Sequence, residues 1–278
     1  MTRSQLAPLR DVIKRHGLGA KRSLGQHFLL DLNLTDRIAR TASITAEDNV
    51  IEIGPGPGGL SRALLDSPAK RVFAIEKDPR CIDALAELST TYPDRFHLIH
   101  GDALEIDLTE AVPAPRRIVA NLPYNVATPL LIKWLRIADK FSGMTLMFQT
   151  EVAERLIAQP RTKAYGRLSV ITQWRCAVSK AFNVPKDAFT PPPKVSSSVV
   201  NLTPRAEPLG EAQWESLETV TAAAFGQRRK MLRSSLKSLN IDPETVEIPG
   251  TARAEELSVE QFCVLARVYD KARRSETR

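Results

Sequence analysis

Apolar and polar positions follow two alternating patterns over residues 49–148. Short runs of β-favouring residues are separated by stretches in which apolar residues recur at helical spacing, so strands should alternate with helices. The predicted strands cover residues 50–53, 71–75, 96–99, 117–120 and 144–148, and the predicted helices cover residues 60–65, 81–88 and 129–135. Alternation of this kind with short connections predicts a mainly parallel, doubly wound α/β sheet of the Rossmann-like type.

The pattern changes beyond a proline-rich stretch at residues 185–193. One further strand is predicted at residues 195–202. From residue 211 onward only helical spacing is found, at residues 211–224, 228–239 and 258–273. The change near Pro204 predicts an α/β domain over residues 1–204 and a small all-helical domain over residues 205–278.

Composition narrows the class of protein. Of the 278 residues, 43% are hydrophobic and 26% are charged, which is typical of a globular chain rather than a disordered or fibrous one. No apolar run approaches the roughly 20 residues that cross a bilayer, and the basic N-terminus lacks the apolar stretch of a secretory signal. The cysteines, Cys81, Cys176 and Cys263, are far apart and form no C-x-x-C pair. We therefore expect a cytoplasmic protein with no metal site, an organellar setting being the alternative.

Basic residues are clustered rather than spread evenly along the chain, whose formal net charge is +7. Eight basic residues and one acidic residue lie between Arg155 and Lys194, and a second basic run lies between Gly226 and Asn240. That run consists of Arg228, Arg229, Lys230, Arg233 and Lys237. Local clusters of this kind suit a polyanion such as RNA or DNA, although solvated helix faces explain the charge pattern alone equally well.

A glycine-rich segment, residues 52–59, follows the first predicted strand and opens a helix. Gly54, Gly56 and Gly59 satisfy the dinucleotide pattern G-x-G-x-x-G, in which glycines permit a sharp turn and a close approach of a ligand. Glu76 ends the second strand, where a carboxylate accepts hydrogen bonds from ribose hydroxyls. NAD and S-adenosylmethionine both carry that ribose, so the motif leaves both cofactors open, beside a purely structural turn.

Two prolines within the loop favour S-adenosylmethionine. Pro55 and Pro57 have no backbone N–H, so the loop offers fewer donors to a pyrophosphate. S-adenosylmethionine has no phosphate and needs no such donors.

The tetrapeptide Asn121-Leu122-Pro123-Tyr124 follows the fourth strand, at the sheet edge where ligands bind in such folds. As a bare string it is a weak signal, because Asn-x-Pro turns are common. After a glycine loop and a ribose carboxylate it acquires a chemical meaning. An adenine amine is a poor nucleophile, and two acceptors, the Asn121 side-chain oxygen and the Leu122 carbonyl, would direct its lone pair at an electrophilic methyl group. Tyr124 would stack on the extruded base.

Several further motifs occur in a fixed order with these two. They lie at residues 24–29, 52–58, 76, 101–103, 121–124, 149–156, 165–169, 189–195 and 225–230. On these motifs the chain resembles the KsgA/RsmA family, whose members use S-adenosylmethionine to dimethylate two adjacent adenosines near the 3′ end of small-subunit (16S) ribosomal RNA. The resemblance runs from Leu24 to about Leu239 and implies a class I S-adenosylmethionine-dependent methyltransferase fold, an RNA partner and a monomer.

The resemblance also implies roles for individual residues. Cofactor contacts would come from His27, the main chain at Leu29, Gly54, Glu76, Asp102 and Asn121. The catalytic residues would be Asn121, Leu122, Pro123 and Tyr124. The target would be held by Tyr124, Phe189, Arg228, Arg229, Lys230 and Arg233, with Phe189 stacking on the adenine opposite Tyr124. Structural alternatives remain for three of them: His27 as a packing residue, Asp102 as a helix cap and Phe189 as plain core.

The C-terminal motif at residues 225–230 separates close relatives within this resemblance. Erm-type resistance methylases resemble the same catalytic domain but modify a large-subunit adenosine and lack Phe-x-x-Arg-Arg-Lys. Its presence favours the small-subunit enzyme, with Phe225 anchoring the segment to its own core and the basic residues, Lys237 included, facing phosphates. The competing hypotheses are a nicotinamide-dependent oxidoreductase and a non-catalytic assembly or transcription factor on the same scaffold.

Overall fold

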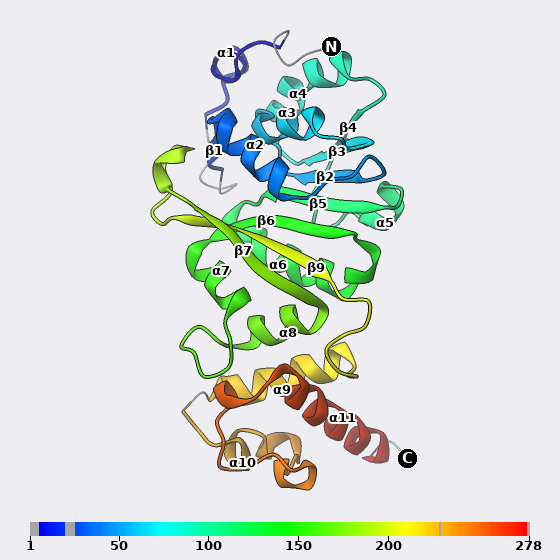
Figure 1. Ribbon diagram of the computed structural model, residues 1–278, viewed down its shortest axis with the longest axis vertical. Helices are drawn as coiled ribbons and strands as arrows, with labels where there is room; N and C mark the ends of the chain where they lie inside the picture. The colour runs from blue at the N-terminus through cyan, green and yellow to red at the C-terminus, as the bar shows by residue number, and fades with distance from the viewer. Residues whose placement is uncertain (1–5, 20–25, 228, 277–278) are drawn as a thin grey trace. The chain divides into compact units, whose positions relative to one another are not determined.

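The computed structural model describes residues 6–19, 26–227 and 229–276 (Figure 1). The chain divides into two compact units. Unit 1 comprises residues 1–153 and 179–203, and unit 2 comprises residues 154–178 and 204–278. Residue 204 thus begins one stretch of unit 2, whereas residues 154–178, which the sequence analysis placed in the first domain, group with unit 2 as well.

A seven-stranded sheet forms the framework of unit 1. In spatial order its strands are β4 (Phe96–His100), β3 (Arg71–Glu76), β2 (Asn49–Ile53), β5 (Arg116–Asn121), β6 (Gly143–Gln149), β9 (Ser197–Pro204) and β7 (Cys176–Val184). The first five are parallel, and β9 runs antiparallel to β6. The predicted doubly wound α/β fold is therefore confirmed. Because β3 and β5 lie on opposite sides of β2, the strand order reverses there, and ligands of such sheets bind at that reversal.

Helices connect the strands of unit 1. They are α1 (Leu9–Arg15), α2 (Leu32–Thr41), α3 (Gly59–Asp66), α4 (Pro79–Thr91), α5 (Leu108–Ala111) and α6 (Tyr124–Arg136), followed by the 3₁₀ turn η3 (Ala138–Lys140). Their starts follow from local chemistry: Asp78 caps α4 through the Arg80 N–H, and Pro79 occupies the first helical position. All five residues of β2 are buried, as expected for a central strand with helices on the sheet.

A two-stranded ladder joins distant parts of unit 1. Strand β1 (Phe28–Leu29) pairs antiparallel with β8 (Phe189–Thr190), which follows the turn η4 (Lys186–Ala188). Leu29 lies opposite Phe189 in this ladder. The pairing brings the segment that carries His27 beside the segment that carries Phe189.

Unit 2 is helical. It contains α8 (Arg167–Arg175), α9 (Trp214–Gly226), α10 (Leu232–Ser235), α11 (Val259–Glu276) and the 3₁₀ turns η5 (Lys237–Leu239), η6 (Pro243–Val246) and η7 (Ala254–Glu256), while α7 (Thr150–Ile157) spans the junction between the units. Among the described helices, none is long and apolar enough to cross a membrane.

The predicted helix at residues 228–239 is wrong in extent. Within the described part of this stretch, residues 229–239, the α-helix is limited to Leu232–Ser235 and is followed by a 3₁₀ turn. The cause lies outside the segment: the Leu232 N–H donates to the Ala252 carbonyl (2.8 Å) and the Arg233 N–H to the Gly250 carbonyl (3.0 Å). Because these donors are taken by a neighbouring segment, a continuous helical ladder cannot start before them.

Candidate active site

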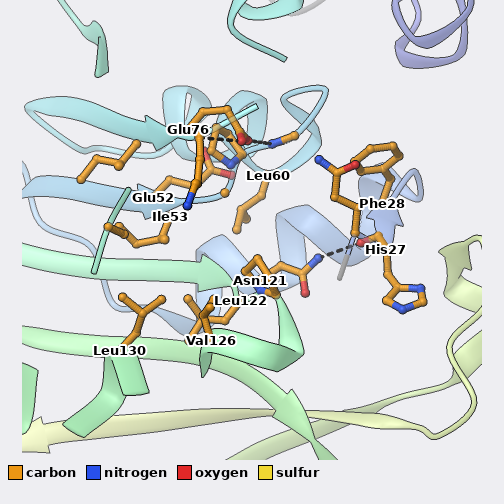
Figure 2. A pocket seen from close by; sticks show the side chains of 18 of the residues that line it. His27, Phe28, Glu52, Ile53, Leu60, Glu76, Asn121, Leu122, Val126 and Leu130 are labelled. Atoms are coloured by element: carbon orange, nitrogen blue, oxygen red, sulfur yellow. Dashed lines mark hydrogen bonds between the residues drawn. The ribbon is translucent and has the colours of Figure 1, made fainter. Parts of the chain in front are cut away.

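A cavity of about 230 Å³ opens at the carboxyl ends of β2, β3 and β5, at the reversal of strand order (Figure 2). The residues that line it include Gln26–Leu29, Glu52–Pro57, Ile75–Lys77, Gly101–Ala103 and Asn121–Val126. All of them belong to unit 1. The structure therefore brings together the six residues predicted to contact the cofactor.

The glycine loop is shaped for close approach. Gly56 has φ +56°, a left-handed conformation in which a side chain is strained. A Cβ atom at Gly59 would lie 2.6 Å from the Leu29 carbonyl oxygen, so only glycine lets β1 reach the first turn of α3. The loop thus forms one wall of the cavity, and the segment with His27 and Leu29 lies directly on it.

The N–H groups of this loop are already engaged. Gly54 donates to the Ile75 carbonyl (2.9 Å), Gly56 to the Glu76 carboxylate (3.1 Å) and Gly58 to the Pro55 carbonyl (3.0 Å). Pro55 and Pro57 have none. From residue 54 to residue 58 no N–H remains for a pyrophosphate, so the loop fits S-adenosylmethionine and disfavours NAD.

Glu76 is held by main-chain donors at the end of β3. One carboxylate oxygen accepts from the Gly56 N–H, and the other accepts from the N–H groups of Lys77 (2.8 Å) and Asp78 (2.7 Å). Burial raises the pKa of Glu76, and these three bonds oppose that effect. Glu76 is only 6% exposed and lines the cavity, and these hydrogen bonds fix its orientation in the ligand-free protein.

A second carboxyl group, Glu52, lies on the same wall. It is 2% exposed, and the Ser61 hydroxyl donates to it at 2.6 Å. The pKa of Glu52 is raised to about 8, mainly by burial; the Ser61 hydrogen bond opposes this rise and the nearby charge of Glu76 adds to it. Glu52 was not predicted as a site residue beyond its place in the glycine-rich segment, because its position as the fourth residue of a buried strand gives no sign of its surroundings.

Asp102 closes another side of the cavity in a loop held by two lysines. Its carboxylate binds the Lys77 ammonium (2.6 Å) and accepts from the Leu104 N–H (2.9 Å), and the Lys77 bond is the main cause of its lowered pKa. The structural alternative of a capping role is thus partly realised, in a turn rather than a helix. Lys133 of α6 donates to the carbonyls of Ala103, Leu104 and Ile106, the last two at 2.7 Å. Lys133 is the polar residue within the apolar stretch 129–135, and this break in the pattern could have indicated that it has a buried partner.

The Asn121 side chain ends β5 with a defined orientation. Its amide nitrogen donates to the main-chain carbonyl of His27 at 3.3 Å (Figure 2). A carbonyl oxygen can only accept, so the nitrogen must face His27 and the Asn121 side-chain oxygen must face away from it. This contact spans 94 residues of sequence and fixes an acceptor at the cavity wall.

The next residues carry the chain into α6. Leu122 is buried, and Pro123 is the N-cap of the helix. The first-turn N–H of Val126 donates to the Pro123 carbonyl (3.1 Å) and therefore does not occupy the Leu122 carbonyl. The Tyr124 hydroxyl shares a hydrogen bond with the Ser197 hydroxyl (2.6 Å), which ties its ring to β9.

Three rings gather beside this turn. The His27 ring lies 5.5 Å from that of Tyr124, tilted by 31°, and 6.4 Å from that of Phe189, edge-on. The His27 Nδ1 lies 2.8 Å from the Pro191 carbonyl. Phe189 is only 2% exposed and packs in the core, as one structural alternative held. In this structure the ring that lies beside Tyr124 is the His27 imidazole rather than Phe189.

The predicted RNA-facing residues of unit 2 lie on an exposed segment. Arg229, Lys230 and Arg233 are exposed, and Arg228 lies outside the described residues. Phe225 packs between the rings of Tyr165 (6.0 Å) and Phe262 (5.4 Å). Among the described residues, no group of three or more His, Cys, Asp or Glu side chains is arranged to hold a metal ion.

Comparisons with known proteins agree with one another. The sequence profile of the family described as Ribosomal RNA adenine dimethylase matches residues 17–271. Two proteins named Ribosomal RNA small subunit methyltransferase A are similar to this chain over nearly its whole length. The one from Paramagnetospirillum magneticum is 61% identical over 270 residues, covering 96% of both chains. The one from Rhodospirillum rubrum is 60% identical over 271 residues, covering 96% of this chain and 94% of the relative.

Two solved structures are similar in fold and sequence. A dimethyladenosine transferase from Plasmodium falciparum has a TM-score of 0.76 and 27% identity, over 88% of this chain and 98% of that one. The 23S rRNA methyltransferase ErmE has a TM-score of 0.66 and 28% identity, over 87% of this chain and 99% of that one. The similarity thus extends well beyond the sheet.

Proposed function

This chain belongs to the ribosomal RNA adenine dimethylase family, and from that premise we propose how its cavity performs the reaction. The chain is an S-adenosylmethionine-dependent methyltransferase that dimethylates adenine in small-subunit ribosomal RNA. We propose that the acceptors are the N6 amines of two adjacent adenosines near the 3′ end of 16S rRNA, giving N6,N6-dimethyladenosine during ribosome assembly.

One observation carries the mechanism: the His27 carbonyl orients the Asn121 amide so that its oxygen is an acceptor at the cavity wall. The Asn121 oxygen and the Leu122 carbonyl would take the two hydrogens of the adenine amine and turn its lone pair toward the donor. S-adenosylmethionine supplies a methyl group on a positively charged sulfur, which leaves readily. The protein's task is therefore positioning, and no strong general base is required.

The remaining contacts of the cofactor follow the cavity wall. Glu76 would accept the ribose hydroxyls, and Asp102 the adenine amino group of the cofactor. Gly54 would border its methionine part, with His27 and the Leu29 main chain covering it. The hydrogen-bonding groups of the cavity wall support this assignment. Carboxylates accept from hydroxyl and amine donors, and the N–H groups of the glycine loop from residue 54 to residue 58 are already engaged and so unavailable to a phosphate.

The target base would stack on Tyr124, with Pro123 stiffening the turn. Placing Phe189 on the other face of the base requires the His27 ring to leave its place near Tyr124, since that ring now lies beside both. We keep this sandwich as a proposal.

We also propose roles for the two domains and a partner for the enzyme. Residues 1–204 would form the catalytic domain with its N-terminal arm, and residues 205–278 a helical RNA-binding domain that includes Arg228. The partner would be the small ribosomal subunit or its precursor, met by a monomeric, cytoplasmic enzyme without a metal cofactor.

The purified protein should dimethylate undermethylated small subunits when supplied with S-adenosylmethionine. We expect two N6,N6-dimethyladenosines per 16S rRNA in nuclease digests analysed by mass spectrometry. Large subunits, offered in parallel, should remain unmodified. Unmodified 16S rRNA, or methylation confined to the large subunit, would contradict the proposal.

Removing basic side chains from unit 2 should weaken the salt dependence of RNA binding. Lys230→Gln and Arg233→Gln each remove an exposed positive charge, and each lost phosphate contact should reduce the slope of log affinity against log salt by about 0.7–0.9. The control is Lys70→Gln, because Lys70 is equally exposed but precedes β3, at the end of the strand remote from the cavity. A slope that responds to Lys70 as strongly as to Lys230 would argue against a phosphate-binding segment.

A further inference from the structure

The two carboxyl groups on the cavity wall differ in their hydrogen bonds. Glu76 accepts from three main-chain N–H groups, which favour its anionic form against the burial that raises its pKa. Among the described residues, Glu52 accepts a hydrogen bond from one hydroxyl, that of Ser61 in the first turn of α3. Glu52 is also only 2% exposed, on β2 between β3 and β5. Burial with so little compensation disfavours an anion at Glu52.

The groups that face Glu52 supply no positive charge. From α3 comes the Ser61 hydroxyl and from β3 the carboxylate of Glu76, and Asn121, at the end of β5 on the same cavity wall, is uncharged. The cavity wall also includes Lys77, which forms an ion pair with Asp102, and His27, whose Nδ1 is within hydrogen-bond distance of the Pro191 carbonyl. Within the described residues Glu52 forms no ion pair. A neutral carboxyl is therefore the stable form in the ligand-free protein, consistent with a pKa of about 8.

The cofactor and its product differ in one charge. S-adenosylmethionine carries a sulfonium, whereas S-adenosylhomocysteine has a neutral thioether, and the two molecules otherwise share every charged group. A carboxyl group that can ionise beside the ligand is therefore able to distinguish them, because an opposite charge in a low-dielectric site favours the ionised form.

We propose that Glu52 is a proton-linked counter-charge for the methyl donor: protonated in the free protein, it releases its proton to solvent when the sulfonium cofactor enters the cavity, and it regains a proton when the product, which lacks the sulfonium charge, is left there. This inference rests on the proposed function. Its consequence is selective attraction of the donor over the product. That matters for this reaction, since dimethylation of one amine uses two donor molecules, and the product must leave between them.

Proton release on binding tests the proposal directly. Calorimetric titrations of S-adenosylmethionine and S-adenosylhomocysteine are run at pH 7 in phosphate and in Tris, whose ionisation enthalpies differ. A group with a pKa near 8 is about nine-tenths protonated at pH 7, so the donor should release most of one proton and the product almost none. At pH 9 the release caused by the donor should nearly vanish.

Two variants assign the proton to Glu52. Glu52→Gln keeps an oxygen for the Ser61 hydroxyl but cannot ionise, so proton release should disappear and the preference for donor over product should fall about tenfold or more. Ser61→Ala removes the hydrogen bond that stabilises the anion, so the pH at which release is half-maximal should rise; a merely structural role would not move that midpoint. Glu110→Gln, at an exposed glutamate of α5, is the matched control and should behave as the wild type.

The outcomes separate the two proposals. Equal binding enthalpies for S-adenosylmethionine in both buffers at pH 7 would overturn the role of Glu52 and leave the proposed function intact. Proton release that persists in Glu52→Gln would overturn it too, because the titrating group would then lie elsewhere. Failure of S-adenosylmethionine to bind in either buffer would instead refute the proposed function. If Glu52→Gln does not fold, the midpoint of proton release in Ser61→Ala decides the matter: an unshifted midpoint would overturn the assignment to Glu52.

Discussion

The rate of methyl transfer is expected to fall about 100- to 1000-fold in Asn121→Ala, while the variant still folds and binds S-adenosylmethionine. The substitution removes an oriented acceptor that, in the proposed mechanism, binds the amine as the new bond forms. Loss of one preorganised polar group of this kind costs about 100- to 1000-fold in kcat in other enzymes. Single-turnover transfer to small subunits measures the rate, and calorimetry measures cofactor affinity.

A second substitution at this position separates orientation from acceptance. Asn121→Asp keeps an acceptor but replaces the amide N–H₂ with an oxygen that repels the His27 carbonyl, so activity should also fall steeply. Asn33→Ala makes the same chemical change as Asn121→Ala at an exposed position of α2 and should be silent. Full activity of Asn121→Ala would remove the central element of the mechanism.

Glu76→Gln should weaken S-adenosylmethionine binding by about 100-fold, corresponding to roughly 3 kcal/mol. The change is nearly isosteric, yet the amide N–H₂ must face either the Gly56 N–H or those of Lys77 and Asp78. Donor would then meet donor in a buried position, and the ribose would lose a charged acceptor. The glycine loop is held by the same carboxylate, so its shape should loosen with it.

Affinity and thermal stability are both informative for Glu76→Gln. Calorimetry gives the dissociation constant, and a modest drop in Tm should accompany it, because a main-chain donor loses its partner. Glu47→Gln, at an exposed glutamate before β2, is the control for loss of a carboxylate charge. Undiminished affinity in Glu76→Gln would show that the ribose is held elsewhere.

The strands of the sheet were predictable because their side chains carry the information locally. Each predicted strand between residues 50 and 148 lies within an observed one, differing by one or two residues at the ends. A central strand such as β2 is buried along its whole length, so its apolar run is unambiguous. The edge strand β7 was missed because most of its residues are exposed or half-buried, and no alternation marks them.

The cavity was predictable only in part. Strand ends and the glycine loop indicated where Gly54, Glu76 and Asn121 would meet, since the carboxyl ends of parallel strands share an edge. Contacts between distant segments left no such pattern: the Asn121–His27 bond and the Tyr124–Ser197 bond both depend on how the chain returns to the sheet. The environment of Glu52 was hidden for the same reason, because burial and the lack of a cation are properties of the packed fold.

The pairing of β1 with β8 has a consequence for how the enzyme comes into being on the ribosome. His27 and Phe189 are brought together by a ladder whose strands are separated by about 160 residues of chain. Since synthesis proceeds from the N-terminus, the sheet strands through β6 can associate while the second strand of that ladder has not yet been translated. The aromatic side of the cavity is completed only later, so a nascent chain can pair its parallel strands before all the residues that we propose to hold the target base are in place.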